Sequence, residues 1–158
     1  MENISKAKGR DLPISTKQSI EICNFLRGKT LQTSKRILQE VIDEKQAIPF
    51  KRFNKDMGHR PGKIAAGRYP QKSCKQFIKI LDSAEANAQS KGLNANSLII
   101  KSISANRASR PARHGRHLGR EMKRTHLDVV LEEKSPKQEV KKTEEKKNDR
   151  KEIPKPKN

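Results

Sequence analysis

Residues 69–104 read YPQKSCKQFIKILDSAEANAQSKGLNANSLIIKSIS, and the spacing of the apolar residues changes within this stretch. The first part predicts a helix over residues 71–91, with one apolar face formed by Cys74, Phe77, Ile78, Leu81, Ala84 and Ala88. Pro70 suits the start of a helix and Gly92 suits its end. The second part predicts a strand over residues 97–104, because it is rich in bulky and β-branched side chains, namely Leu98, Ile99, Ile100 and Ile103. A helix that leads into a strand favours the α+β fold class.

Two further helices are predicted before this stretch. Gly28 stands where a glycine commonly ends a helix, so the first helix spans about residues 16–27. Its apolar face is formed by Ile20, Cys23 and Leu26, with Ile22 and Phe25 beside them. The second helix, over residues 34–45, begins at a capping Thr33 or Ser34. Its apolar residues repeat at helical spacing and are Ile37, Leu38, Val41 and Ile42.

Two strands and two long connections complete the predicted elements. Residues 125–133 predict a strand through Leu127, Val129, Val130 and Leu131, and residues 7–15 predict an edge strand, where a proline is tolerated. The connection over residues 104–125 is too long for an ordinary hairpin loop, so it forms either a long two-stranded arm or a long ordered loop. Because long structureless segments are uncommon in compact domains, we expect the connection over residues 47–68 to be a functional loop.

The composition indicates a partner that carries many negative charges. The 158 residues include 37 Lys and Arg against 18 Asp and Glu, which gives a net charge of +19, and only 31% of the residues are hydrophobic. Nucleic acid suits such a charge, because phosphates that are neutralised by Lys and Arg release condensed counterions. An anionic membrane surface would need a basic amphipathic helix with large apolar residues opposite, and we find none.

The sequence also bounds the domain organisation and the cellular location. The composition changes after Glu133, because residues 134–158 are highly charged and contain only two sizeable apolar residues, Val140 and Ile153. We therefore predict one domain over residues 1–133 and a charged flexible tail over residues 134–158. No run is long and apolar enough to cross a membrane, residues 1–15 contain no apolar signal segment, and only two cysteines occur, so we expect a cytoplasmic protein.

The segment between the last two predicted strands, residues 106–124, reads NRASRPARHGRHLGREMKR and contains a single acid, Glu121. Its basic residues are Arg107, Arg110, Arg113, Arg116, Arg120, Lys123 and Arg124. The first four recur at every third position, so on an extended backbone they alternate between opposite faces. Cations on both sides suit an arm that is surrounded by RNA, since arginine makes planar phosphate contacts and stacks on bases. The alternative is a solvated basic loop.

A second basic segment, residues 49–70, interleaves cations with aromatic rings. Its basic residues are Lys51, Arg52, Lys55, Arg60, Lys63 and Arg68. Phe50, Phe53 and Tyr69 offer either stacking platforms for bases or a plug at the edge of a small core. The predicted RNA-binding surface also includes Arg27, Lys29 and His59.

Catalytic and metal-binding alternatives have weaker support in the sequence. His114, His117 and Glu121 suggest a metal-dependent nuclease, but two glycines in the same segment disfavour the helix on which such spacings work. Cys23 and Cys74 lie on apolar helix faces and are expected to be core residues. We find no nucleophile–base arrangement, no glycine-rich phosphate loop and no zinc-type cysteine pair. We therefore predict no metal, no cofactor and no enzymatic activity.

The competing nucleic-acid hypothesis is a chromosomal, architectural DNA-binding protein. Such a protein would also be basic and poor in aromatic residues. It would usually carry a recognition helix or minor-groove wedges on a symmetric dimer. Here the candidate cations lie mainly on predicted loops, which favours RNA.

Four motifs occur in a fixed order: LRGKT at 26–30, GRYPQKS at 67–73, RPARHGR at 110–116 and KRTHLDVVLEE at 123–133. With this order and spacing the chain, over about residues 7–133, resembles the large-subunit ribosomal protein family numbered twenty-two in bacteria and seventeen in eukaryotes. The segment PFKRFN, followed by GHR and GRYP, resembles the archaeal and eukaryotic branch of that family.

The resemblance implies a fold in which three helices pack on a three-stranded antiparallel sheet that carries a long β-hairpin. It implies binding to large-subunit ribosomal RNA, a role in its assembly, and a hairpin over about 104–125 that lines the nascent-peptide exit tunnel. The implied partners are this RNA, neighbouring ribosomal proteins and the nascent peptide, with no membrane and no homo-oligomer. The tip of the hairpin would consist of Arg110, Pro111, Ala112, Arg113, His114, Gly115 and Arg116.

Overall fold

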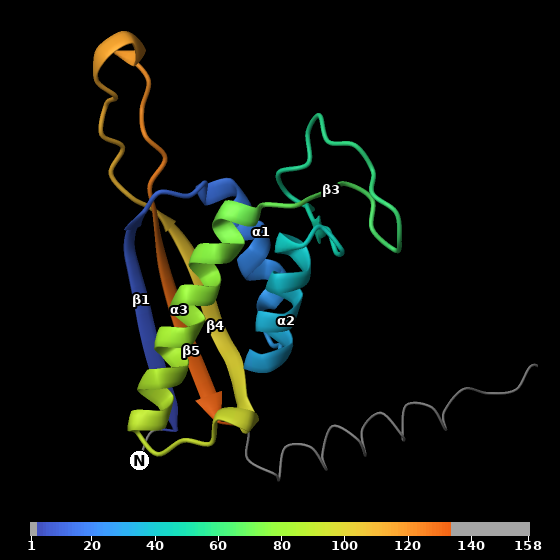
Figure 1. Ribbon diagram of the computed structural model, residues 1–158, viewed down its shortest axis with the longest axis vertical. Coiled ribbons are helices and arrows are strands. Elements are labelled where there is room, and N and C mark those ends of the chain that lie inside the picture. Colours follow the sequence, from blue (N-terminus) through green and yellow to red (C-terminus); the bar gives the residue numbers. More distant parts are fainter. Residues whose placement is uncertain (1–2, 134–158) are drawn as a thin grey trace, which may run out of the picture.

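The structure, a computed structural model, describes residues 3–133. The predicted tail, residues 134–158, lies outside the described residues, so the division of the chain near 133 stays a prediction. Figure 1 shows two layers, in which helices cover one face of a three-stranded sheet. The predicted α+β fold, with three helices and an antiparallel three-stranded sheet, is therefore confirmed.

The sheet has its last strand in the middle. β5 (Thr125–Glu133) pairs antiparallel with β1 (Ile4–Leu12) on one side and with β4 (Leu98–Arg107) on the other. Side chains of a strand alternate between faces, and the buried side chains of β5 are Thr125, Leu127, Val129 and Leu131. β1 is an edge strand, as predicted, but it spans residues 4–12 and not 7–15. β4 continues beyond its predicted end at 104, because its pairing with β5 extends as far as Arg107.

α3 (Gln71–Ser90) agrees with the predicted helix and packs along β1 (Figure 1). Its large buried side chains include Cys74, Phe77, Ile80, Leu81, Ala84 and Ala88. Ile78 is half-buried and packs against the core, as predicted, and Ile80, which was not predicted in this face, is buried in it as well. Ile80 packs over Gly9 of β1, where an added Cβ would lie 2.4 Å from Ile80 Cδ1. Gly9 therefore allows the helix to approach the strand closely.

The other two helices are α1 (Thr16–Leu26) and α2 (Leu31–Ile42). The buried residues of α1 are Ser19, Glu21, Ile22, Cys23 and Leu26. Of the three residues predicted to form the apolar face, Cys23 and Leu26 are buried and Ile20 is only half-buried. α2 begins earlier than predicted because Thr30 caps it, and the Thr30 hydroxyl accepts a hydrogen bond from the N–H of Thr33 at 3.4 Å. The two predicted caps lie inside the first turn of the helix.

The turn between α1 and α2 covers part of the outer edge of β4. Gly28 has a φ of +78°, a conformation that favours glycine, and its N–H donates to the carbonyl of Ile100 at 3.0 Å. The N–H of Ile100 donates in return to the carbonyl of Lys29 at 3.0 Å. These bonds satisfy strand groups that would otherwise be open to pairing with another chain.

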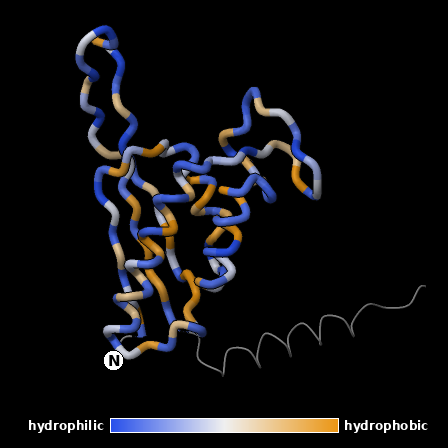
Figure 2. Tube along the Cα trace, viewed as in Figure 1, coloured by the Kyte–Doolittle hydropathy of each residue, from blue (hydrophilic) through white to orange (hydrophobic). Residues whose placement is uncertain are grey.

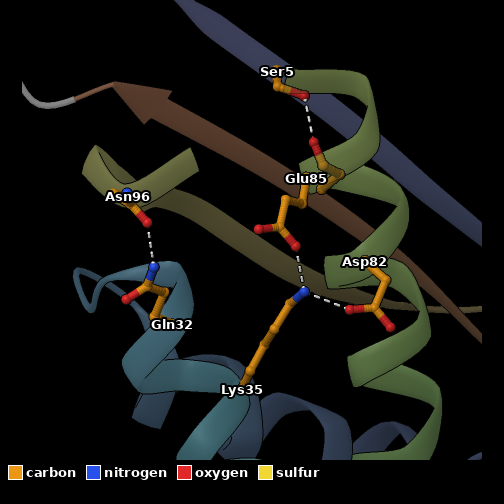
Figure 3. Close-up of polar contacts among 7 residues, drawn as sticks. Ser5, Gln32, Lys35, Asp82, Glu85 and Asn96 are labelled. Atoms are coloured by element: carbon orange, nitrogen blue, oxygen red, sulfur yellow. Dashed lines mark hydrogen bonds and ion pairs between the residues drawn. The ribbon is translucent and has the colours of Figure 1, made fainter. Parts of the chain in front are cut away.

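Figure 3 shows the polar contacts that join α2, α3 and the sheet at the end of the molecule away from the arm. Lys35 of α2 lies between Asp82 and Glu85 of α3 and pairs with both. Burial by itself lowers the pKa of Lys35, but the hydrogen bonds and charges of the two carboxylates outweigh burial, so the pKa lies above its usual value. The hydroxyl of Ser5 donates to the carbonyl of Ala84 at 2.8 Å, which ties α3 to β1.

Short elements complete the fold. β2 (Ile48–Pro49) pairs with β3 (Gly67–Arg68), so the predicted open connection over residues 47–68 is closed at its base. A 3-10 turn, η1 (Ala95–Ser97), leads from α3 into β4. Hydrophobic residues gather between the sheet and the helices, while the arm that extends from β4 and β5 is mostly hydrophilic (Figure 2). In the described part of the chain, no helix is both long and apolar enough to cross a membrane.

Candidate nucleic-acid interface

We call residues 108–124, which extend beyond the sheet between β4 and β5, the arm. Its two sides are joined by backbone hydrogen bonds from Ala108 N to Arg124 O (3.3 Å), Met122 N to Pro111 O (2.9 Å) and Arg113 N to Arg120 O (2.8 Å). A 3-10 turn, η2 (Gly115–His117), forms its tip. The arm contains no regular strand, since β4 ends at Arg107, β5 begins at Thr125, and Ala112 and Glu121 form only an isolated bridge. Of the two predicted alternatives, the structure is therefore closer to the long ordered loop, whose two sides run antiparallel and are joined by a few bonds.

All cations of the arm except the half-buried Arg124 are exposed, on a segment that has no core of its own. Between Ala108, which is buried at the base, and Met122, which is half-buried, every residue is exposed. Arg110 pairs with Glu121 at 3.3 Å, and the guanidinium of Arg124 donates to the carbonyl of Asp11 at 3.1 Å. The other predicted cations of the segment are exposed and are Arg107, Arg113, Arg116, Arg120 and Lys123.

We call residues 50–66, which lead from β2 to β3, the basic loop. The N–H of Phe50 donates to the carbonyl of Ala66 at 2.9 Å, and the N–H of Arg60 donates to the carbonyl of Ala65 at 2.9 Å. These bonds extend the short β2–β3 pair into the loop. The loop and the adjoining β3 expose the remaining predicted residues, which are Lys51, Arg52, Lys55, His59, Arg60, Lys63 and Arg68.

Glu21, on α1, holds the first part of the basic loop and was not among the predicted residues. Its side chain is buried, and its carboxylate accepts hydrogen bonds from the N–H groups of Lys51 (3.2 Å), Arg52 (2.8 Å) and Phe53 (2.8 Å). Three such bonds fix the backbone that carries two of the loop cations. The signal in the sequence is an acid inside the apolar run SIEIC of residues 19–23.

The aromatic side chains divide between the two predicted roles. Phe50 is buried in the core, so of the two alternatives left open for this ring the structure has the core plug. Phe53 and Tyr69 are half-buried against the core and lie under cations. The guanidinium of Arg52 lies 5.2 Å from the ring centre of Phe53, and that of Arg60 lies 5.2 Å from the ring centre of Tyr69. The rings therefore position the cations that stand over them.

The arm, the basic loop and the first turn of α1 lie at the same end of the molecule (Figure 1). One hollow of about 370 Å³ is lined by Lys17, Ile20, Phe53, Arg107, Arg110, Lys123 and Arg124. A second hollow, of about 510 Å³, shares Lys17, Phe53 and Lys123 and adds Arg52, Lys55 and Arg68. Seven predicted cations are thus brought together with Lys17, which the sequence analysis missed because a lone lysine at a helix start is unremarkable.

The remaining predicted residues, apart from Arg60 over Tyr69, lie in three further places. Arg27, Lys29, Lys51, His59 and Lys63 line a separate hollow between α1 and the basic loop. Arg113 lies with Lys72, Lys123 and Arg124 in a hollow at the base of the arm, and Lys72 is a second cation that the sequence analysis missed. Arg116 and Arg120 lie near the tip of the arm, away from the residues of the basic loop.

The groups considered for metal chemistry have other surroundings. Within residues 3–133, no cluster of three or more His, Cys, Asp or Glu side chains is arranged to hold a metal ion. Glu121 instead pairs with Arg110. Cys23 and Cys74 are buried, as predicted, and burial raises the pKa of each thiol to about 12.

The part of the sequence that forms the described domain is similar to known proteins. A family model described as ribosomal protein L22p/L17e matches residues 7–132. Large ribosomal subunit protein uL22 of Methanococcus vannielii is 42% identical over 136 residues, which cover 82% of this chain and 89% of the relative. The proteins of the same name from Archaeoglobus fulgidus and Methanoculleus marisnigri are 40% and 39% identical, over 81% and 84% of this chain and 87% and 91% of each relative.

These relatives are archaeal, which agrees with the branch that the sequence motifs indicated. The match over most of the chain also confirms the predicted cytoplasmic location and the prediction that the protein is not an enzyme. The chain therefore belongs to the ribosomal protein L22p/L17e family and is a structural protein of the large ribosomal subunit.

Proposed function

We propose that the protein binds large-subunit ribosomal RNA through the arm and the basic loop and aids the folding of that RNA. One observation carries this proposal: two extensions that are distant in sequence place exposed cations around shared hollows at one end of the molecule. The shared hollows make the arm and the loop parts of one surface. A polyphosphate backbone that crosses this surface would release counterions from both extensions at once.

We propose in addition that the arm lines the nascent-peptide exit tunnel with the turn at Gly115–His117 as its tip. Of the residues 110–116 predicted for the tip, Arg110 and Arg113 line hollows at the base of the arm, so only the last residues of that range belong to the tip. The family resemblance implies this position, and the shape of the arm supports it. An exposed segment with cations on both sides and no core of its own suits a site that is enclosed by RNA. In that position the tip would contact the nascent peptide, and the globular end would contact neighbouring ribosomal proteins.

The test is the salt dependence of binding to large-subunit ribosomal RNA. We expect Arg110→Ala, Arg113→Ala and Arg116→Ala together to lower the slope of log affinity against log salt by about 2 to 3, because each lost phosphate contact removes roughly 0.7 to 0.9. The unfolding midpoint should change little, since these side chains are exposed. A control variant that removes three exposed lysines of the sheet, Lys6, Lys8 and Lys101, should leave the slope nearly unchanged.

Two results would contradict the proposal. Equal slopes for the arm variant and the wild-type protein would show that the arm does not contact phosphate. Equal competition by duplex DNA and by structured ribosomal RNA, at matched phosphate concentration, would favour the architectural DNA-binding alternative.

A further inference from the structure

The hollow between α1 and the basic loop differs from the hollows at the base of the arm. Its volume is about 860 Å³, against about 370 Å³ and 510 Å³ for the hollows that the arm and the loop share. A volume of this size is typical of sites that enclose a small organic group. The residues that line it combine two kinds of surface, one cationic and one apolar.

The cationic part of the hollow carries no free negative charge among the described residues. Arg27, Lys29, Lys51, Arg52 and Lys63 contribute positive charges. Glu21 is the single acid among the lining residues, and both of its carboxylate oxygens accept backbone N–H groups of the basic loop. The hollow therefore attracts an anion, and the negative charge of Glu21 is already compensated locally.

The apolar part of the hollow is formed by Phe25, Met57 and Ile64, which are all half-buried. The ammonium of Lys29 lies over the Phe25 ring, 4.6 Å from its centre, so a cation covers one face of this ring and leaves its other face and its edge for further contacts. Methionine adapts to flat groups because its side chain is flexible and polarisable. Inorganic phosphate would contact only the cations and leave the apolar walls without a partner. An apolar peptide would contact only the apolar walls and leave the cations without one.

The walls of the hollow are held in place before any ligand binds. Glu21 fixes the backbone of residues 51–53, and Phe50 is buried directly before them. On the opposite side the bond from Arg60 N to Ala65 O holds the returning part of the loop. A preformed site loses less conformational entropy when its ligand binds.

We propose that this hollow binds one unstacked nucleotide of the RNA, with its base against Phe25, Met57 and Ile64 and its phosphate beside the cations. The proposal rests on the proposed RNA binding and adds a position at which a base, and not only the backbone, is contacted. RNA is commonly recognised through bases that leave the helical stack and pack on aromatic or guanidinium groups. A bulged or looped nucleotide, rather than a paired one, is the chemical class that fits.

The first test is a titration of the full chain with AMP and UMP, followed by NMR, with ribose 5-phosphate and inorganic phosphate as controls. We expect the nucleotides to shift the methyl signals of Met57 and Ile64 and the ring signals of Phe25. The two controls should shift only signals of the cationic residues. Equal patterns for nucleotides and ribose 5-phosphate would reduce the hollow to an anion site, and no shift of the three apolar residues at millimolar nucleotide would overturn the proposal.

The second test fills the hollow without removing a charge. Ala65 lines the hollow and is exposed, so Ala65→Trp should occupy the space of the base and lower the affinity for large-subunit ribosomal RNA by about 5- to 100-fold, the range that stacking of one base accounts for. The slope of affinity against salt should stay unchanged, because every cation remains. Ala86→Trp, on the exposed side of α3, is the matched control and should bind as the wild-type protein does.

The two proposals can fail separately in this experiment. If the wild-type chain does not bind the RNA, the proposed function fails. If the wild-type chain binds and Ala65→Trp binds equally well, only the nucleotide site fails.

Discussion

The arm and the basic loop carry similar side chains but are supported differently. The loop is closed at its base by β2 and β3, is fixed by the buried carboxylate of Glu21, and places Phe50 in the core. The arm has sparse cross-strand bonds and one exposed ion pair, and nearly all of its side chains face solvent. The comparison indicates that the loop presents its cations in a preformed arrangement, whereas the arm has little internal support for a single shape. If the arm binds RNA as proposed, we expect it to reach its final shape only in that contact.

The largest expected effect compares one apolar residue from each region. Phe50→Ala should lower the free energy of unfolding by about 3 to 5 kcal/mol, because it opens a cavity in the core. Leu118→Ala should change it by less than about 0.5 kcal/mol, since Leu118 is 78% exposed on the arm. Urea unfolding of both variants measures the difference. A large loss of stability for Leu118→Ala would show that the arm packs against the domain. That result would contradict the difference in support between the arm and the loop.

An intermediate effect is expected from the carboxylate that supports the loop. Glu21→Ala should cost about 2 to 4 kcal/mol, because three backbone N–H groups lose their acceptor. Hydrogen exchange followed by NMR should show faster exchange of the amides of residues 51–53, with unchanged exchange at Arg113 and Met122 of the arm. Glu21→Gln, which keeps one acceptor oxygen, should have a smaller effect on the same amides. Unchanged protection at 51–53 in Glu21→Ala would contradict the preformed loop.

The smallest effect concerns the scaffold that carries both regions. The pKa of Lys35 is raised in the folded protein, so the stability from its pairs with Asp82 and Glu85 is complete below the unfolded pKa. This contribution should disappear as the pH rises through the higher folded pKa. It should amount to less than about 1 kcal/mol, since the pair is partly exposed. Lys35→Met should therefore flatten the alkaline part of the stability profile, measured by urea unfolding, without altering RNA binding.

The elements with a strong local pattern were predictable from the sequence. α3 has a proline near its start, a glycine after its end and an apolar face, and in β5 every second residue from Thr125 to Leu131 suits a buried strand face. The predictions failed or were incomplete where contacts between distant parts of the chain decide which residues are buried and where a helix begins. Ile80 is buried because Gly9, distant in sequence, leaves room for it, and α2 starts early because Thr30 caps it.

The sequence predicted which cations belong to the candidate interface, but not how they are arranged in space. Charge alone identified the arm and the loop. Nothing in the local sequence indicated that Lys17 would stand between them, or that the buried partner of the loop would be Glu21. An acid within an apolar helical run was the one visible signal, and its meaning depends on backbone groups that come from residues 51–53.

The central place of β5 in the sheet has a consequence for biosynthesis. β1 and β4 do not pair with each other, since each pairs only with β5, and the register joins Ile4 to Glu132. During translation the first strand must therefore wait, unpaired, until the final strand has been made. The helices of an emerging chain can form early, but its sheet closes in one late step that joins the two ends of the domain. Such long-range closure is slow, and until it occurs the exposed strand edges favour aggregation, so prompt capture by RNA would protect the newly made protein.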